Sequence, residues 1–262
     1  MERLPDWVTL LRAPNPGPMT LDGTNTWILR APGQEYGVVI DPGPLDEGHL
    51  ARIAAHGPFH FVLITHGHHD HVEGAARLSE LLGGTAVLAV DPKHVLHGTP
   101  LDRDERLGGS ELEVEVLDSP GHTADSVCFL VECGTDRVML TGDTVLGRGT
   151  AVVAWPDGDL GDYLTSLTRL AAYENMVLLP GHGPALSDCG AAARAYLAHR
   201  RSRLEQVRAA IAAGADTPDA VVDLVYPDID PAIRFAAEAS AGAQLDYLRR
   251  ESPTGPEQLD PL

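Results

Sequence analysis

The chain of 262 residues is poor in cysteine, which argues against a fold held together by disulfide bonds. Its three cysteines, Cys128, Cys133 and Cys189, are odd in number and lack the spacing of a metal finger. A disulfide framework needs an even set of cysteines and an oxidising compartment. We therefore interpret the three thiols as packing residues of a protein that resides in a reducing compartment.

Long hydrophobic runs are missing as well. Apolar residues make up 44% of the chain, yet none of their runs approaches the length of about 18 residues that a membrane-spanning helix needs. The first residues, MERLPDWVTLLRAPNPG, contain acidic residues and prolines where a secretion signal has a clean apolar segment. The sequence predicts a cytoplasmic protein with no membrane partner.

Positive charge and aromatic side chains are also scarce. The 19 basic residues face 38 acidic ones, which gives a net charge of −19, and aromatic residues make up 5% of the chain. Such a protein repels polyanions at long range and offers few surfaces on which bases stack. The exception is the segment 191–213, with five arginines against Glu205 alone. We expect any anionic partner to bind there.

Short apolar runs alternate with Gly, Pro and Asp clusters over the first two thirds of the chain, which predicts strands. Helical spacing occurs between some of them, so the pattern predicts an α/β fold. The predicted strands are 27–29, 38–40, 61–64, 86–90, 112–117, 126–131, 138–140 and 176–179, and the predicted helices are 72–82 and 163–172.

The residue pattern changes from strand-like to helical after residue 190. A long Ala/Arg/Leu helix ends near Gly214, and two amphipathic segments follow at 218–226 and 231–250. We predict a first domain over residues 1–190, a small helical domain over residues 191–252 and a mobile tail over residues 253–262.

The segment Thr65–Gly74, THGHHDHVEG, directly follows a predicted strand and has the frame His66-x-His68-x-Asp70-His71. Three later segments also place a ligand-type residue beside a glycine at the end of a predicted strand: Pro120-Gly121-His122-Thr123, Gly142-Asp143 and Pro180-Gly181-His182-Gly183. Imidazole and carboxylate ligands at this density suit Zn²⁺. The repetition predicts one metal site assembled from several strand ends, in a two-metal hydrolase.

Five neutral imidazoles and two carboxylates around two dications leave a charge of about +2, and a bridging hydroxide lowers it to about +1. Zinc lowers the pKa of bound water to about 7, so the hydroxide is available as a nucleophile at neutral pH. Asp70 is placed to orient that hydroxide and to handle its proton. The remaining histidines, among them His94 and His199, lack convergent partners in the sequence and are interpreted as structural.

The motif set HxHxDH, PGHT, GD and PGHG resembles the metallo-β-lactamase superfamily over most of residues 20–185. The resemblance implies a four-layer αββα sandwich with two Zn²⁺ ions, or other divalent metals in their place. It implies that His66, His68 and His122 hold one ion, that Asp70, His71 and His182 hold the second, and that Asp143 bridges them. It also implies that Asp41 supports the loop that carries the histidines.

The flanking segments 15–27 and 142–150, and His199-Arg200 followed by Arg203, resemble the beta-lactamase-like protein 2 family. That resemblance implies a winged-helix-like domain at the C-terminus and endoribonuclease activity on single-stranded RNA. If RNA is the substrate, the phosphate-contacting patch would be Arg194, Arg200, Arg201, Arg203 and Arg208; the alternative is an ordinary solvated helix face. Little chain remains for the final hairpin of a winged helix, so no specific double-stranded DNA binding is expected.

Three other functions remain open. The same site would hydrolyse small thioesters or lactones, as glyoxalase II does, with a small-molecule ester in place of RNA. Iron in place of zinc would favour an oxidoreductase. A non-catalytic binding module is the third alternative, although a purely structural zinc site has four closed ligands and no open neighbouring site.

Overall fold

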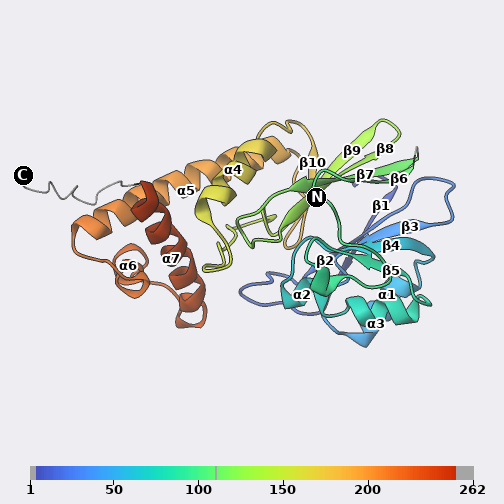
Figure 1. Cartoon of the computed structure of the whole chain (residues 1–262), viewed down its shortest axis with the longest axis horizontal. Helices are drawn as coiled ribbons and strands as arrows, with labels where there is room; N and C mark the ends of the chain where they lie inside the picture. The colour runs from blue at the N-terminus through green and yellow to red at the C-terminus, as the bar shows by residue number, and fades with distance from the viewer. Residues whose placement is uncertain (1–3, 110, 252–262) are drawn as a thin grey trace, which may run out of the picture.

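The computed structural model describes residues 4–109 and 111–251 and contains two five-stranded sheets that face each other (Figure 1). In the first sheet the strands lie in chain order, with β1, β2 and β3 antiparallel and β3, β4 and β5 parallel. Its strands are β1 (Val8–Arg12), β2 (Asn25–Leu29), β3 (Gly37–Ile40), β4 (Phe59–Leu63) and β5 (Ala86–Leu88).

The second sheet has the order β10-β9-β8-β7-β6, and only its pair β9 and β10 is parallel. Its strands are β6 (Arg106–Gly109), β7 (Leu112–Asp118), β8 (Val127–Cys133), β9 (Asp136–Gly142) and β10 (Val177–Pro180). Because β7 and β9 both run antiparallel to β8, the strands β7, β9 and β10 end at the same edge of the sheet.

Helices cover the outer faces of both sheets, which confirms the predicted αββα layering (Figure 1). The helices α1 and α3 pack on the first sheet, and α4 and α5 pack on the second. The helices are α1 (Glu47–Ala54), α2 (His69–Val72), α3 (Ala75–Leu81), α4 (Leu160–Leu170), α5 (Cys189–Ala212), α6 (Pro218–Val225) and α7 (Arg234–Glu251), with 3-10 turns at Pro92–His94 and Pro231–Ile233.

The core between the sheets is built from alternate strand residues that point inward. Trp27 and Leu63 of the first sheet meet Phe129 and Leu140 of the second, and all four side chains are at most 2% exposed. Burial of each such side chain stabilises the fold by about 1.5–3 kcal/mol. This central layer fixes the two sheets relative to each other, and with them the loops that carry the histidines.

The structure adds elements that the sequence pattern did not predict. Strands β1 and β6 lie at sheet edges, where partial exposure and the glycines of β6 weaken the alternation of apolar residues. The predicted helix 72–82 is interrupted, because α2 ends before Gly74 and α3 begins after it. The chain passes close to α1 at this point: a Cβ atom on Gly74 would lie 2.7 Å from the Leu50 side chain of α1, so a glycine is needed there.

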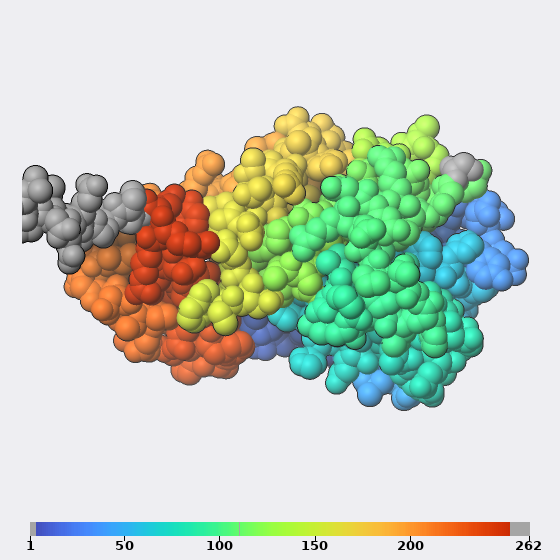
Figure 2. All heavy atoms as spheres, in the orientation of Figure 1, coloured from blue at the N-terminus to red at the C-terminus, as the bar shows by residue number. Residues whose placement is uncertain are grey.

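Residues 181–251 contain helices and 3-10 turns but no strand. Helices α5, α6 and α7 form a lobe at one end of the molecule, coloured orange to red in Figures 1 and 2. The winged-helix character is therefore not confirmed, and the division near residue 190 stays a prediction, since one apolar cluster joins α4 and α5 to α6 and α7. The predicted mobile tail lies outside the described residues. In the described part of the chain, no helix combines the length and apolarity needed to cross a bilayer.

Candidate metal centre

The predicted ligands meet where the strands of both sheets end. The loop after β4 carries His66 and His68, and α2 follows it directly with Asp70 and His71. The loops after β7, β9 and β10 bring His122, Asp143 and His182 to the same edge. The structure thus gathers all seven residues into two adjoining groups.

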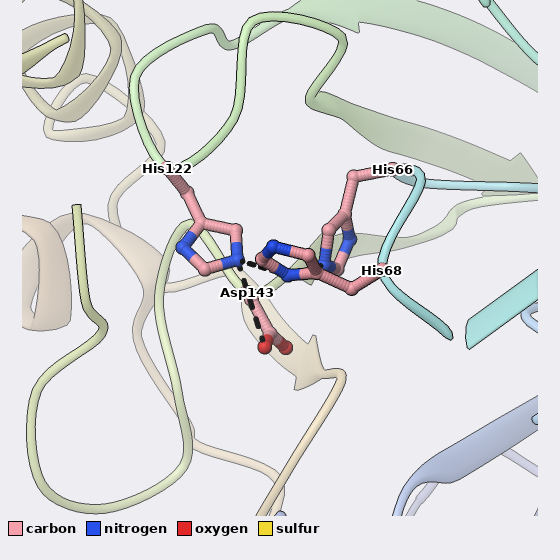
Figure 3. A group of neighbouring side chains, drawn as sticks. All are labelled: His66, His68, His122 and Asp143. Atoms are coloured by element: carbon pink, nitrogen blue, oxygen red, sulfur yellow. Dashed lines mark hydrogen bonds and ion pairs between the residues drawn. The ribbon is translucent and has the colours of Figure 1, made fainter. Parts of the chain in front are cut away.

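The first group consists of His66, His68, His122 and Asp143, whose ligand atoms all lie within 4.8 Å of one another (Figure 3). The Nδ1 atom of His68 lies 3.0 Å from Nε2 of His66 and 3.0 Å from Nε2 of His122. One Nδ1–H can satisfy only one of these contacts well, so nitrogen lone pairs converge here without enough protons. Such a donor set fits a cation at its centre.

The second group consists of Asp70, His71 and His182. Nε2 of His182 lies 3.1 Å from Oδ2 of Asp70, and Nε2 of His71 lies 3.4 Å from the same oxygen. Asp143 stands between the two groups, with Oδ2 at 3.3 Å from His182 Nε2 and 3.9 Å from His122 Nε2. Its Oδ1 atom is buried without a hydrogen-bond partner and lies 3.5 Å from Nε2 of His71. A carboxylate within reach of both groups fits a ligand shared by two divalent ions, so the residues present fit the dinuclear site.

The outer nitrogens of the histidines are held by neighbouring groups, which orients the rings. The Nδ1 atom of His122 lies 2.6 Å from the carbonyl oxygen of Val152. The Nδ1 atom of His71 lies 2.7 Å from Oδ2 of Asp41, and Nδ1 of His66 lies 3.0 Å from the hydroxyl of Thr65. In each case the remaining nitrogen is the one that faces the site.

Asp41 ties the end of β3 to the start of the histidine loop. Its Oδ1 accepts the backbone N–H of Thr65 at 2.8 Å, and its Oδ2 accepts the Thr65 hydroxyl at 2.7 Å. The residue is 2% exposed and has a φ of 51°, a left-handed conformation that aspartate tolerates better than most residues. These bonds are the ones that the predicted supporting role of Asp41 requires.

Burial and charge set the protonation of the first group. Burial, together with the neighbouring imidazoles of His71 and His122, holds the pKa of His66 well below its usual range. Burial and the His122 ring lower the pKa of His68 to about 4. Burial alone would raise the pKa of Asp143, but His182 and His71 outweigh it and hold that pKa well below its usual range. Neutral imidazoles and an ionised carboxylate are the forms that bind a metal ion.

In the second group the carboxylates instead favour protonation of the rings. Burial opposes a charge on His182, yet Asp143 and Asp70 outweigh it and raise the pKa of His182 to about 9. The pKa of His71 is likewise raised, against burial, by Asp70 and Asp143. A metal ion bound here would take the place of these protons, so binding at this group releases protons and strengthens as the pH rises.

Thr24 is a site residue that sequence reasoning missed. Its buried hydroxyl donates to Oδ2 of Asp70 at 2.8 Å and lies 3.0 Å from the amide nitrogen of Asn15. Thr24 thereby orients the carboxylate that is predicted to handle the proton. No motif spacing marks it, because it lies just before β2, 46 residues before Asp70.

We expect Thr24→Val to lower kcat by about 10- to 100-fold with little change in metal content, since an orienting partner is lost and the shape is kept. Thr24→Ser keeps the hydroxyl and is the matched control. Steady-state kinetics and metal analysis of both variants test this. Equal kcat values in the two variants would contradict a role for the hydroxyl.

A cavity of about 310 Å³ opens beside the metal centre. His122 and Asp143 lie at its inner end, and residues of α5, of α7 and of the segment between α6 and α7 form its opposite wall. Apolar lining residues include Met19, Leu21, Leu146, Ile229 and Ile233. Trp155 is not among the lining residues; its ring packs against Gly242 of α7 and stays 43% exposed.

The five arginines of α5 do not form one phosphate-contacting patch. Arg194 pairs with Glu174 at 2.8 Å, and Arg208 pairs with Glu251 at 2.8 Å. Arg201 lines a separate hollow with Arg208, while Arg200 and Arg203 line the cavity beside the metal centre. The structure therefore divides the predicted patch between two hollows, and contact of these arginines with phosphate stays a prediction.

Two histidines that were interpreted as structural lie beside other polar or charged side chains that the sequence did not indicate. His199 lines the cavity together with Arg200 and Arg203. The ligand atoms of Asp91, His94 and Asp125 lie within 4.8 Å of one another, beside Gly67 of the histidine loop. Asp91 also pairs with Lys93 at 2.6 Å, which supplies the positive charge in this half-exposed group.

Comparison with known proteins identifies the fold and its relatives. A sequence model of the protein family described as the metallo-beta-lactamase superfamily matches residues 19–182 of this chain. The lactamase-like protein vrtG of Penicillium aethiopicum is 33% identical over 235 residues, which are 86% of this chain and 73% of that protein. A beta-lactamase-like protein 2 homolog of Caenorhabditis elegans is 29% identical over 259 residues, 90% of this chain and 82% of that protein. An atrochrysone carboxyl ACP thioesterase of Aspergillus chevalieri is 32% identical over 226 residues, 80% of this chain and 68% of that protein.

Solved structures with a similar fold also include members of the metallo-beta-lactamase family. A metallo-beta-lactamase family protein of Thermus thermophilus superposes with a TM-score of 0.76 at 24% identity, over 95% of both chains. A protein crystallised in a di-iron-bound form has a TM-score of 0.54 at 27% identity, over 68% of this chain and 94% of its own. The first similarity extends through the helical lobe of this chain.

Proposed function

We propose, because this chain belongs to the metallo-beta-lactamase superfamily, that its two ligand groups hold two divalent metal ions and that it hydrolyses a small thioester or ester. The observation that carries the proposal is Asp143, whose carboxylate stands between the two groups and at the inner end of the 310 Å³ cavity. A cavity of that size with apolar walls suits a small organic substrate. The thioesterase among the similar proteins supports the same substrate class.

When bound, the ions supply a water of lowered pKa and polarise the oxygen of the scissile carbonyl. The protein's own residues do the rest. Asp70, held by the Thr24 hydroxyl, accepts the proton of the attacking water and returns it to the leaving group. The hydrogen bonds of the outer histidine nitrogens hold the rings in place.

We infer zinc as the metal, because imidazole and carboxylate donors in groups of three and four suit it. The similar protein with a di-iron-bound form makes iron the second candidate. Elemental analysis of protein purified without added metal distinguishes the two. Two iron atoms per chain together with oxygen uptake would place an oxidoreductase ahead of a hydrolase.

Single-stranded RNA is the second substrate candidate, supported by the similarity to beta-lactamase-like protein 2 homologs. The separation of the α5 arginines and the charge of −19 favour the small ester over RNA. The expected cytoplasmic location and the absence of a membrane partner stay predictions.

A panel of substrates tests the proposal. Metal-loaded protein is incubated with S-acyl N-acetylcysteamine, S-acyl glutathione, a lactone and a single-stranded RNA oligonucleotide. We expect turnover of at least one thioester, its loss on treatment with a chelator and its return on addition of Zn²⁺. Cleavage of RNA without hydrolysis of any thioester or lactone would replace the proposal by the ribonuclease alternative.

A further inference from the structure

The cavity beside the metal centre contains a buried positive charge that no acidic residue of the described chain neutralises. Arg200 is 4% exposed, and its guanidinium forms no ion pair with any carboxylate in the described part of the chain. One Nη atom donates to the carbonyl oxygen of Ala151, the guanidinium carbon lies 5.1 Å from the centre of the Tyr163 ring, and the Nε–H is buried without a partner. A buried, unpaired guanidinium is costly, because it has lost its hydration without gaining a counter-ion.

The other residues that line the cavity include few acidic groups that could balance this charge. Acidic residues outnumber basic ones by two to one in the chain, yet Asp143 is the one carboxylate among the described residues that line the cavity. Arg203 lies one helical turn after His199, and its guanidinium carbon lies 4.5 Å from the centre of the Tyr226 ring. Arg148 also lines the cavity, but Asp22 neutralises it across a 2.8 Å contact. Positive charge is thus left over at the wall formed by α5.

We propose that Arg200 and Arg203, with His199 beside them, form an anion subsite, and that the substrate is a thioester or ester that also carries a carboxylate or phosphate group. This inference rests on the proposed function, since it names the substrate class of the same site. The planar guanidinium matches either anion by paired hydrogen bonds, and such charge-assisted bonds are strong in a site shielded from water. The anion would supply the counter-ion that Arg200 lacks.

The arrangement also explains how an acidic protein binds an anionic substrate. Exposed charges separated by more than about 8 Å are largely screened at physiological ionic strength, so the exposed acidic residues act weakly on a small ligand in the cavity, and Asp143 is the lining carboxylate that acts on it directly. The two arginines act at contact distance. Selectivity therefore depends on these side chains and not on the net charge.

Kinetics on matched substrates test the subsite. One acyl group is presented on neutral N-acetylcysteamine, on glutathione with its carboxylates and on coenzyme A with its phosphates, and kcat/KM is measured for each. We expect the wild-type protein to prefer at least one anionic thioester over the neutral one. Arg203→Gln should lower that preference by about tenfold, and Arg200→Met by more, mostly through KM. The arm with the larger preference identifies the carboxylate or the phosphate as the source of the anion.

Arg201→Gln is the matched control, since Arg201 is the exposed neighbour on the same helix and lines a different hollow. It removes the same charge, so an effect of bulk electrostatics would be equal in Arg201→Gln and Arg203→Gln. We expect the control to keep the wild-type preference. If both variants change it equally, or if neither Arg200→Met nor Arg203→Gln changes it while thioesters are hydrolysed, the subsite is rejected and the proposed function stands.

A binding measurement decides the case in which no thioester is hydrolysed and the proposed function fails. The melting temperature of the metal-loaded full chain is recorded with S-butyl glutathione, S-butyl coenzyme A and neutral S-butyl N-acetylcysteamine. We expect one anionic thioether to raise it more than the neutral one, and this difference to disappear in Arg200→Met but not in Arg201→Gln. Equal shifts by all three compounds would overturn the subsite.

Discussion

Replacement of Asp143 by asparagine is expected to lower hydrolysis on the order of a thousandfold and to reduce the metal content from two ions to one or none per chain. Asparagine keeps the shape of the side chain but offers a neutral oxygen where a carboxylate lies between His122 and His182. It also removes the negative charge that favours cations in both groups. Steady-state kinetics and elemental analysis of the purified variant measure the two effects separately.

The same substitution at Asp102 is the control, because that carboxylate is exposed and belongs neither to the ligand groups nor to the cavity lining. Asp102→Asn should keep both the metal and the activity, and circular dichroism should show both variants folded. A folded Asp143→Asn protein that retains two ions and near-normal activity would contradict the bridging role.

Gly121→Ala is expected to destabilise the protein by about 3 kcal/mol or more, since overpacking and backbone strain add at this position. Gly121 has a φ of +133°, and a Cβ atom there would lie 2.3 Å from Cα of Tyr163 at the first turn of α4. The backbone would have to shift, and His122 is the next residue. We therefore expect the urea midpoint and the metal content to fall together.

Gly33→Ala separates the effect of backbone strain from the effect of overpacking. Gly33 also has a positive φ, +78°, but an added Cβ would meet no atom within 4 Å. The cost there should be about 1 kcal/mol, from backbone conformation alone. Similar urea midpoints for the two variants would show that the contact with Tyr163 relaxes without cost.

The meeting of the seven candidate ligands was predictable because the motifs that carry them are local in sequence. The frame from His66 to His71 and the glycine-flanked His122, Asp143 and His182 each follow a buried strand, and strand ends at one sheet edge bring such residues together. The αββα layering followed from the resemblance and is confirmed. Roles for the individual ligands, including the proton transfer by Asp70, stay predictions that the variants above test.

The surroundings of the ligands could not be read from the sequence. Thr24 reaches Asp70 across 46 positions, through the pairing of β2 in the first sheet. Arg200 lies in an arginine-rich segment that resembles a solvated helix face, yet it is buried because helices and loops pack on several sides of α5. The edge strand β1 and the short helix α1 have too few buried residues to show a clear periodicity of apolar residues in the sequence.

All seven candidate ligands precede Gly183, whereas the outer wall of the cavity comes from α5 and the elements after it. The α5 side of the cavity is thus encoded apart from the ligands, whereas Met19, Leu21 and Leu146 of the other wall are not. We expect mutations after residue 198 to change which molecule is accepted and to leave the ligand groups intact, so chimeras that exchange this lobe between relatives offer a direct route to altered selectivity.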